Sequence, residues 1–287
     1  MEEALPRTAV IVACFNDGAT LPEALDSLRE EEPLEIIVVD DGSDDPRTLA
    51  VLDRVERDGV RILRQANQGP AAARTAALHA TSARYVTALD ADDVQAPGSL
   101  AVLADTLDAN PDLSAVWGDV QTFGEIEVAQ PATPTLDPWL LTYLNDVPAD
   151  ALVRREALLE AGGWRLRGGY EDWDLWLALA GHGRRGMRVP VLTGYYRVRS
   201  SGRMQTQAVA RHDALYAELR TRHAAVFARR RELRRRSGAP WWVKLLFPAV
   251  EALPGASSYT KYRLQNLIRH PGRLVRARLQ RRRAGGA

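Results

Sequence analysis

Cysteine is nearly absent from the sequence, since Cys14 is the only one among 287 residues. A single cysteine excludes an internal disulfide, and no group of cysteine and histidine residues has the spacing of a zinc site. We therefore expect a reducing compartment. With 46% apolar and 26% charged residues, the chain has the composition of a globular protein that needs no covalent staple.

Long apolar runs are also absent. A membrane-spanning helix requires roughly 20 consecutive apolar residues, and the best candidate, residues 241–253, is interrupted by Lys244, Pro248 and Glu251. Residues 1–7 include two glutamates and no apolar run, so we predict no signal peptide. These absences favour a cytoplasmic protein and are compatible with peripheral attachment to the inner face of a membrane.

Lysine is missing from the first 219 residues, where 20 arginines stand against 35 acidic residues, a net charge of −15. Residues 220–287 hold 18 basic residues against Glu232 and Glu251, a net charge of +16. The overall formal charge of +1 therefore conceals an acidic body and a basic C-terminal extension.

Short apolar runs alternate with helical patterns in the first half of the chain. Strands are predicted over residues 8–14, 34–39, 60–63 and 85–89, and helices over residues 20–28, 46–57 and 70–80. Thr20 and Glu23 have the spacing of a capping box. Apolar strands that alternate with helices are typical of an α/β fold with a mostly parallel sheet, flanked by helices on both faces.

The pattern is less regular beyond residue 113. Strands are predicted over residues 114–120, 151–154 and 187–198, helices over 155–161 and 172–179, a loop over 130–150, and one long helix over 205–236.

Polar residues follow three of the predicted strands. Asn16 comes after the first strand, Asp40 and Asp41 end the second, and the run 85–89 leads into residues 90–93 (DADD). Because ligands of parallel sheets bind beyond the carboxyl ends of the strands, we expect these side chains to line one binding site. The alternative for the two aspartates and the glycine and serine after them is an ordinary β-turn with a capping aspartate.

The DADD segment places three carboxylates within four residues. A cation would relieve their mutual repulsion, and carboxylate oxygens suit Mg²⁺ or Mn²⁺, ions that commonly also hold phosphate oxygens. Asp90 and Asp92 are therefore candidate ligands of a divalent metal. The alternative is a solvated turn that caps a helix.

Two further charged positions are candidates for a site. Glu171 and Asp172 open an amphipathic helical pattern, where acidic residues either stabilise the helix N-terminus or supply a general base. Arg74 is the only charge inside an alanine-rich helix. It is either exposed or buried with a carboxylate or phosphate partner.

Taken together, five segments resemble the family 2 glycosyltransferases of the GT-A fold, in the family's order and with its approximate spacing. These segments are residues 9–16 (AVIVACFN), 36–43 (IIVVDDGS), 67–74 (NQGPAAAR), 85–93 (YVTALDADD) and 162–177 (GGWRLRGGYEDWDLWL).

The resemblance implies a division of the chain. Residues 1–204 would form a Rossmann-like GT-A catalytic domain, in which residues 1–113 bind the nucleotide-sugar donor and residues 114–204 form the acceptor side. Residues 205–287 would form a helical basic C-terminal extension. The implied reaction is an inverting transfer of a sugar from a nucleoside-diphosphate sugar to an acceptor hydroxyl, of the kind used in the synthesis of bacterial cell-surface polysaccharide or glycolipid.

The resemblance also implies roles for the donor side of the site. Asn16, Asp40, Asp41 and Arg74 would lie around the nucleotide, with the two aspartates near its base and ribose. Asp90 would lie nearer the ribose as the first residue of the D-x-D motif.

On the reacting side, Asp92 would bind Mg²⁺ or Mn²⁺ directly, with Asp90 as the second carboxylate of the motif. Asp172, beside Glu171, would be the catalytic base. The acceptor hydroxyl would then attack the anomeric carbon while the metal stabilises the departing nucleoside diphosphate.

Three positions depart from the family's pattern. Ala13 stands where the family often has proline, and Thr75 stands where it often has asparagine. Arg199 stands where some members place a histidine that helps to bind the metal, so we expect no third protein ligand there. Arg199 or Arg203 would instead meet the diphosphate directly, since guanidinium pairs well with phosphate.

The basic extension contains residues 229–236 (RRRELRRR), followed by residues 240–247 (PWWVKLLF). Arginine clusters beside paired tryptophans fit the interface of an anionic membrane, where a lipid-linked acceptor would also lie. The alternatives are a solvated helical tail and an extension that packs on the acidic body. We do not expect nucleic-acid binding, because no reader motif accompanies the charge.

Two other functions are compatible with parts of the sequence. A sugar nucleotidyltransferase would share the nucleotide-binding half, but such enzymes usually carry a basic glycine-rich loop after the first strand, which residues 16–19 (NDGA) lack. A non-catalytic scaffold would bind membrane or nucleic acid through the extension and would show no metal-dependent binding of nucleoside diphosphates.

Overall fold

The structure is a computed structural model that describes residues 6–130, 132–198 and 210–271. The chain divides into two compact units. The first comprises Met1–Leu136 and Asp146–Gly202, and the second comprises Asp137–Asn145 and Arg203–Ala287. The predicted boundary between residues 204 and 205 lies outside the described residues.

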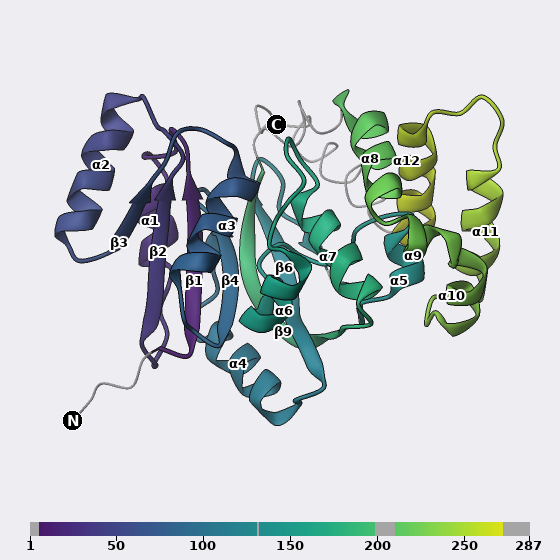
Figure 1. The fold of residues 1–287 in the computed structure, drawn as a ribbon, viewed down its shortest axis with the longest axis horizontal. Coiled ribbons are helices and arrows are strands. Elements are labelled where there is room, and N and C mark those ends of the chain that lie inside the picture. The colour runs from purple at the N-terminus through teal and green to yellow at the C-terminus, as the bar shows by residue number, and fades with distance from the viewer. Residues whose placement is uncertain (1–5, 131, 199–209, 272–287) are drawn as a thin grey trace, which may run out of the picture. The chain divides into compact units, whose positions relative to one another are not determined.

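The first unit is built on one mixed sheet with the strand order β3-β2-β1-β4-β8-β6-β9-β5, in which β7 pairs with β6 (Figure 1). The strands are β1 (Thr8–Cys14), β2 (Leu34–Asp40), β3 (Arg61–Arg64), β4 (Tyr85–Asp90), β5 (Val94–Gln95), β6 (Leu113–Gly124), β7 (Ala129–Gln130), β8 (Leu152–Arg154) and β9 (Arg185–Val198). Strands β3, β2, β1 and β4 pair in parallel, as do β6 and β9, whereas β5, β7 and β8 pair antiparallel. The mostly parallel sheet predicted from the sequence is confirmed.

Helices flank this sheet on both faces. They are α1 (Leu21–Asp26), α2 (Pro46–Arg57), α3 (Pro70–Ala80), α4 (Ser99–Ala109), α6 (Arg155–Ala161) and α7 (Glu171–Gly181). Along β1, Ala9, Val10, Ile11 and Val12 are all fully buried, although successive side chains of a strand point to opposite faces. One apolar cluster joins α1, α2 and α4 to this part of the sheet, and α3 packs on β1 and β2.

The helix after β1 starts without the predicted capping box. Thr20 precedes α1, but its hydroxyl donates to the carbonyl of Asp17 at 3.3 Å and caps no helical N–H. Its backbone ψ of −22° is already helical, whereas a capping side chain requires an extended residue. The helix ends at Asp26, two residues before the predicted end.

The second unit is helical. It contains α5 (Pro138–Leu141), α8 (His212–Arg222), α9 (Ala224–Ala228), α10 (Arg230–Arg236), α11 (Trp241–Glu251) and α12 (Ser258–Arg269). The rings of Trp139 and Phe247 stack with centroids 5.9 Å apart, and Tyr143 packs edge-on against both. The segment predicted as a loop over 130–150 therefore supplies a helix to this core. Within the described ranges, no helix has both the length and the hydropathy to cross a bilayer.

The single long helix predicted over residues 205–236 is wrong for the described part, which forms α8, α9 and α10. The helix is broken because two of its residues bind the same oxygen atom elsewhere in the second unit. The hydroxyl of Tyr216 donates to the carbonyl of Thr142 at 2.7 Å, and the guanidinium of Arg230 donates to the same oxygen. On one straight helix these two residues would be about 21 Å apart, so the chain must turn back between them.

Candidate active site

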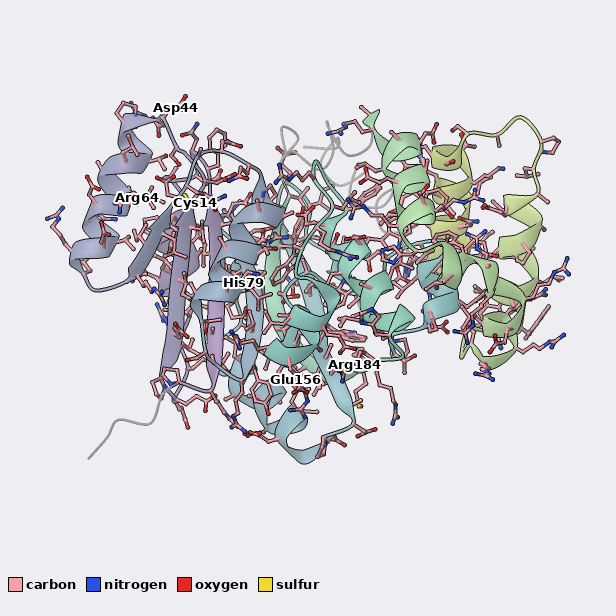
Figure 2. The ribbon with its side chains drawn as sticks, viewed as in Figure 1. Cys14, Asp44, Arg64, His79, Glu156 and Arg184 are labelled. Carbon is pink, nitrogen blue, oxygen red and sulfur yellow. The ribbon has the colours of Figure 1, made fainter. Side chains whose placement is uncertain are left out.

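The carboxyl edge of the parallel strands carries the first acidic residues of the site. In the strand register, Asp40 of β2 lies opposite Cys14 of β1, and Asp90 of β4 lies opposite Ala13. Figure 2 shows Cys14 and Asp44 toward this end of the first unit and Glu156 and Arg184 toward the other. The residues that follow β1, β2 and β4 therefore meet at one edge, where ligands of parallel sheets bind.

Arg74 on α3 connects two acidic segments that are far apart in the sequence. Its guanidinium donates to Asp90, and its Nη1 donates to Glu171 Oε1 at 3.0 Å. The Arg74 side chain is 4% exposed, so it is buried with partners rather than solvated. Burial alone would lower the pKa of Arg74, but the charges of Asp90 and Glu171 outweigh it and raise this pKa above its ordinary value.

The first turn of α7 holds the predicted catalytic pair. Glu171 is occupied by the ion pair with Arg74, and the backbone N–H of Trp173 donates to Asp172 Oδ1 at 2.8 Å. Burial, followed by the neighbouring charge of Glu171, raises the pKa of Asp172 to about 6. A carboxylate with this pKa is ionised at neutral pH and is a stronger base than an exposed aspartate.

The turn after β4 brings a dense group of carboxylates together. Asp93 accepts the backbone N–H of Arg197 at 2.7 Å, and the Arg197 side chain donates to the carbonyl of Asp92 at 2.7 Å. Burial and the charge of Asp90 raise the pKa of Asp93 to about 9. Burial, then Asp90 and the other nearby carboxylates, also raises the pKa of the Tyr196 phenol. This region therefore carries a concentrated negative potential.

Asp150 is an acidic residue of the site that the sequence did not indicate. Its Oδ2 is buried without a hydrogen-bond partner. Burial is the largest cause that raises its pKa to about 6, and the charge of Asp90 adds to it. Its position between α5 and β8, 60 residues from Asp90, gave no local signal, because the segment was predicted to be a loop.

Asp40 and Asp41 hold the backbone of the loops at the sheet edge. Asp40 accepts the N–H of Ser43 at 2.9 Å. Asp41 accepts the backbone N–H groups of Gln68 and Gly69 at 2.9 and 2.7 Å, so its carboxylate fixes the entry to α3. Both aspartates are almost fully buried. Their contacts in this structure are with the chain itself, and a role beside a nucleotide base stays a prediction.

Asn16 performs a similar task on the neighbouring loop. Its Oδ1 accepts the backbone N–H groups of Asp44 and Asp45, each at 3.0 Å, and its Nδ2 donates to the Asp44 carboxylate at 2.7 Å. Its φ of +59° is rare for a residue other than glycine and is best tolerated by asparagine and aspartate. Asn16 thus ties the loop after β1 to the loop after β2.

Thr75 shows why a short hydroxyl side chain suits the position after Arg74. Its Oγ1 accepts the N–H of Trp164 at 3.0 Å and donates to the Trp164 carbonyl at 2.9 Å. Gly163 lies so close that an added Cβ would be 2.8 Å from Thr75 Oγ1. The threonine therefore fastens the turn before α7 to α3, next to the residue that binds Glu171.

The described residues supply only part of a metal site. No group of three or more histidine, cysteine, aspartate or glutamate side chains in the described ranges is arranged to hold a metal ion by itself. Asp90, Asp92 and Asp93 nevertheless offer oxygen donors within a negative region. Mg²⁺ is commonly held by one or two carboxylates together with substrate phosphates and water, and this chemistry fits the residues present. Arg199 and Arg203 lie outside the described residues.

Comparison with known proteins identifies the family of the chain. Residues 9–158 match the family model described as glycosyl transferase family 2, and the chain belongs to that family. Relatives include the succinoglycan biosynthesis protein ExoO of Rhizobium meliloti, 30% identical over 47% of this chain and 42% of that protein. Another is the GalNAc(5)-diNAcBac-PP-undecaprenol beta-1,3-glucosyltransferase of Campylobacter jejuni, 35% identical over 40% of this chain and 38% of that enzyme. The matches thus span less than half of either relative.

Solved structures confirm the GT-A fold. The S. aureus TarS fragment 1–349 in complex with UDP-GlcNAc has a TM-score of 0.60 at 20% identity, covering 86% of this chain and 82% of the other. The mannosyltransferase PcManGT of Pyrobaculum calidifontis, in complex with GDP-Man and Mn²⁺, has a TM-score of 0.56 at 20% identity, covering 94% and 88%. At this level of identity the likeness establishes the fold alone.

Proposed function

We propose that the chain is a metal-dependent, inverting glycosyltransferase that moves a sugar from a nucleoside-diphosphate sugar to an acceptor hydroxyl. One observation carries this proposal. Buried Arg74 joins Asp90 of the D-x-D segment to Glu171, the neighbour of Asp172. The segment suited to a metal-bound diphosphate and the segment suited to an acceptor thereby belong to one site.

On the donor side, Asp92 is the proposed direct ligand of Mg²⁺ or Mn²⁺, with Asp90 contributing to the same site. The ion would supply positive charge against the leaving diphosphate. Arg197 holds the backbone carbonyl of Asp92 through its side chain and the Asp93 carboxylate through its backbone N–H. The solved mannosyltransferase in complex with GDP-Man and Mn²⁺ supports a divalent cation at a site of this fold.

On the acceptor side, Asp172 is the proposed base. The acceptor oxygen attacks the anomeric carbon and forms the new glycosidic bond, while its proton passes to the Asp172 carboxylate. The bond between the anomeric carbon and the diphosphate oxygen breaks, and its electron pair leaves with the nucleoside diphosphate. A single displacement of this kind inverts the anomeric configuration, and general-base assistance contributes about 10²–10⁴-fold to such rates.

The proposed setting is the synthesis of bacterial cell-surface polysaccharide or glycolipid, with residues 1–204 as the catalytic domain. The R. meliloti relative is named for succinoglycan biosynthesis, and the C. jejuni relative is named for a glucosyl transfer to an undecaprenol-linked glycan. The second name supports a lipid-linked acceptor. A location on the cytoplasmic face of a membrane is part of the proposal and rests on the composition of the sequence alone.

The test is a screen of nucleotide-sugars labelled in the sugar, with Mn²⁺, Mg²⁺ or EDTA present. We expect metal-dependent release of nucleoside diphosphate from at least one donor, through transfer or slow hydrolysis. Formation of pyrophosphate or of a new nucleotide-sugar would instead identify a nucleotidyltransferase. Binding of vesicles without any metal-dependent binding of nucleoside diphosphates would identify a scaffold.

A further inference from the structure

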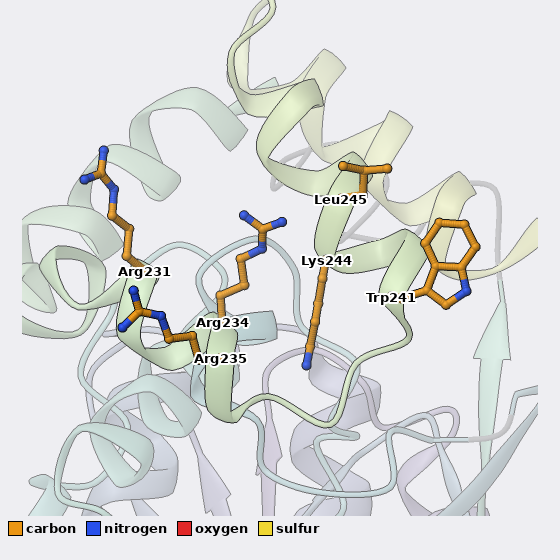
Figure 3. Close-up of a pocket in the computed structure, with 6 residues that line it drawn as sticks. All are labelled: Arg231, Arg234, Arg235, Trp241, Lys244 and Leu245. Carbon is orange, nitrogen blue, oxygen red and sulfur yellow. The ribbon is translucent and has the colours of Figure 1, made fainter.

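Helices α10 and α11 of the second unit form an open basic cleft that the glycosyl-transfer site does not use. The cleft has a volume of about 660 Å³ and is lined by Arg231, Arg234, Arg235, Trp241, Lys244 and Leu245. Figure 3 shows the three arginines of α10 and the Trp241, Lys244 and Leu245 side chains of α11 around it.

Within the described part of the chain, no acidic side chain pairs with the cations that line this cleft. Glu232, the only acidic residue of α10, is occupied by Arg229 and Arg236. The acid of α11, Glu251, pairs with Arg230. Among the residues that the structure describes, Arg231, Arg234, Arg235 and Lys244 form no ion pair. Four positive charges therefore line the cleft without an ion-pair partner among the described residues.

The other component of this surface is apolar. Helix α11 buries Val243 and Phe247 in the unit's core, yet its outer face is also apolar. The exposed large side chains there are Trp241 at 74%, Leu245 at 56%, Trp242 at 46% and Leu246 at 40%. A helix with apolar residues on its outer face as well as its inner face has a partner that is itself apolar.

The combination of unpaired cations and exposed tryptophan and leucine selects one kind of partner. Nucleic acid or an acidic protein would satisfy the charges, but either would leave much of the leucine surface in water. The interface of an anionic bilayer satisfies both, because phosphate headgroups pair with guanidinium groups while tryptophan and leucine enter the boundary of the acyl chains.

We propose that the α10–α11 surface docks on an anionic lipid bilayer, with the basic cleft around lipid phosphate groups and Trp241 and Leu245 inserted beside them. This surface is distinct from the donor and acceptor site of the first unit. The proposal assigns membrane contact to two helices instead of the whole basic extension. It does not depend on the proposed glycosyl transfer.

The test is sedimentation of the full chain with vesicles of phosphatidylglycerol and phosphatidylcholine, compared with vesicles of phosphatidylcholine alone. We expect binding to the anionic vesicles only. Each basic residue near an anionic surface contributes about fivefold to partitioning, so the Arg231→Gln/Arg235→Gln variant should bind roughly 25-fold more weakly.

The matched control is the Arg229→Gln/Arg236→Gln variant, which changes the formal charge equally but removes arginines that already pair with Glu232. We expect its affinity to fall less than threefold. Equal losses for the two double variants would show diffuse attraction to the whole extension and would overturn the assigned surface.

The apolar contact has its own test. Trp241→Ser should reduce the blue shift of tryptophan fluorescence on addition of anionic vesicles to the part that Trp242 contributes, and should weaken binding at least fivefold. Ile126→Ser, which removes an exposed apolar residue of the first unit, should change neither. Circular dichroism checks that each variant is folded. Binding of polyadenylate RNA with no binding of anionic vesicles at the same ionic strength would also overturn the proposal.

Discussion

Arg74 is bound to Asp90 across the carboxyl edge of the sheet, although the two residues come from a helix and a strand 16 positions apart. The same guanidinium reaches Glu171, 97 positions further along the chain. Since the side chain of Arg74 is buried, it orders both acidic segments rather than merely neutralising them. The site is therefore organised around one cation of the chain.

Replacement of Arg74 by alanine should cost stability as well as activity. Two carboxylates would lose a buried partner. Because the Asp90 side chain is 38% exposed, the cost should lie below the roughly 3–5 kcal/mol of breaking a fully buried pair. Arg74→Lys should recover only part of the activity, because a single ammonium cannot reproduce a planar guanidinium that reaches two partners. Thermal unfolding and kcat/KM would measure both effects. Arg84→Ala, which removes an exposed arginine paired with Asp108, should leave them nearly unchanged.

Asp172→Asn should lower kcat by about 10²–10⁴-fold, because the proposed base would be lost. In the wild type, burial and Glu171 raise the pKa of Asp172 to about 6. The base acts only when deprotonated, so kcat/KM should rise as the pH rises through 6 and level off above it. A pH–rate profile measures this. Asp53→Asn, on the exposed side of α2, should behave as wild type, and a flat profile between pH 5 and 8 would contradict the assignment.

Gly42→Ala should disrupt the loop that carries Asp40 and Asp41. Gly42 has a φ of +76°, and an added Cβ would lie 2.8 Å from the backbone nitrogen of Asn67. Gly59→Ala is the matched control, because its φ is +98° but nothing lies within 4 Å of the new atom. Backbone strain of about 1–2 kcal/mol applies to both variants. Gly42→Ala should therefore lose more unfolding free energy than Gly59→Ala, and only Gly42→Ala should bind nucleotide more weakly. Equal losses would mean that the close approach is unimportant.

Thr75→Val should loosen the turn before α7. The substitution keeps the shape of the side chain but removes both hydrogen bonds to Trp164, and groups left without partners cost about 1–3 kcal/mol. We expect lower thermal stability and a higher KM for the acceptor. Thr106→Val removes a hydroxyl that bonds only within α4 and should have a small effect. An unchanged KM for the acceptor in Thr75→Val would show that this turn does not contribute to acceptor binding.

Several elements of residues 1–113 could be predicted closely from the sequence, although α4 was not predicted and α1 ends two residues before its predicted end. Strand β1 and helices α2 and α3 have the predicted ends, because their apolar periodicity and prolines at the helix starts are local signals. The broken helix over 212–236 could not be predicted, since the turn depends on Thr142, which lies about 70 to 90 positions away.

The same distinction applies to the site. Asp40, Asp90 and Asp172 stand at strand or helix ends, where the sequence marks them. Arg197 holds Asp92 and Asp93 through contacts that span more than 100 positions. No short sequence motif predicts such contacts. The choice between an exposed and a buried Arg74 was likewise decided by tertiary packing, not by the alanine-rich helix around it.

The most direct measurement of the central claim is the Mn²⁺-dependent turnover of a nucleotide-sugar donor by wild type, Asp92→Asn and Asp53→Asn. If Asp92 holds the cation against the leaving diphosphate, Asp92→Asn should lower turnover by about 10²–10³-fold, and EDTA should abolish wild-type turnover. Asp53→Asn should match wild type. Unchanged turnover by Asp92→Asn, or full wild-type activity in EDTA, would contradict a metal-dependent transfer at this site.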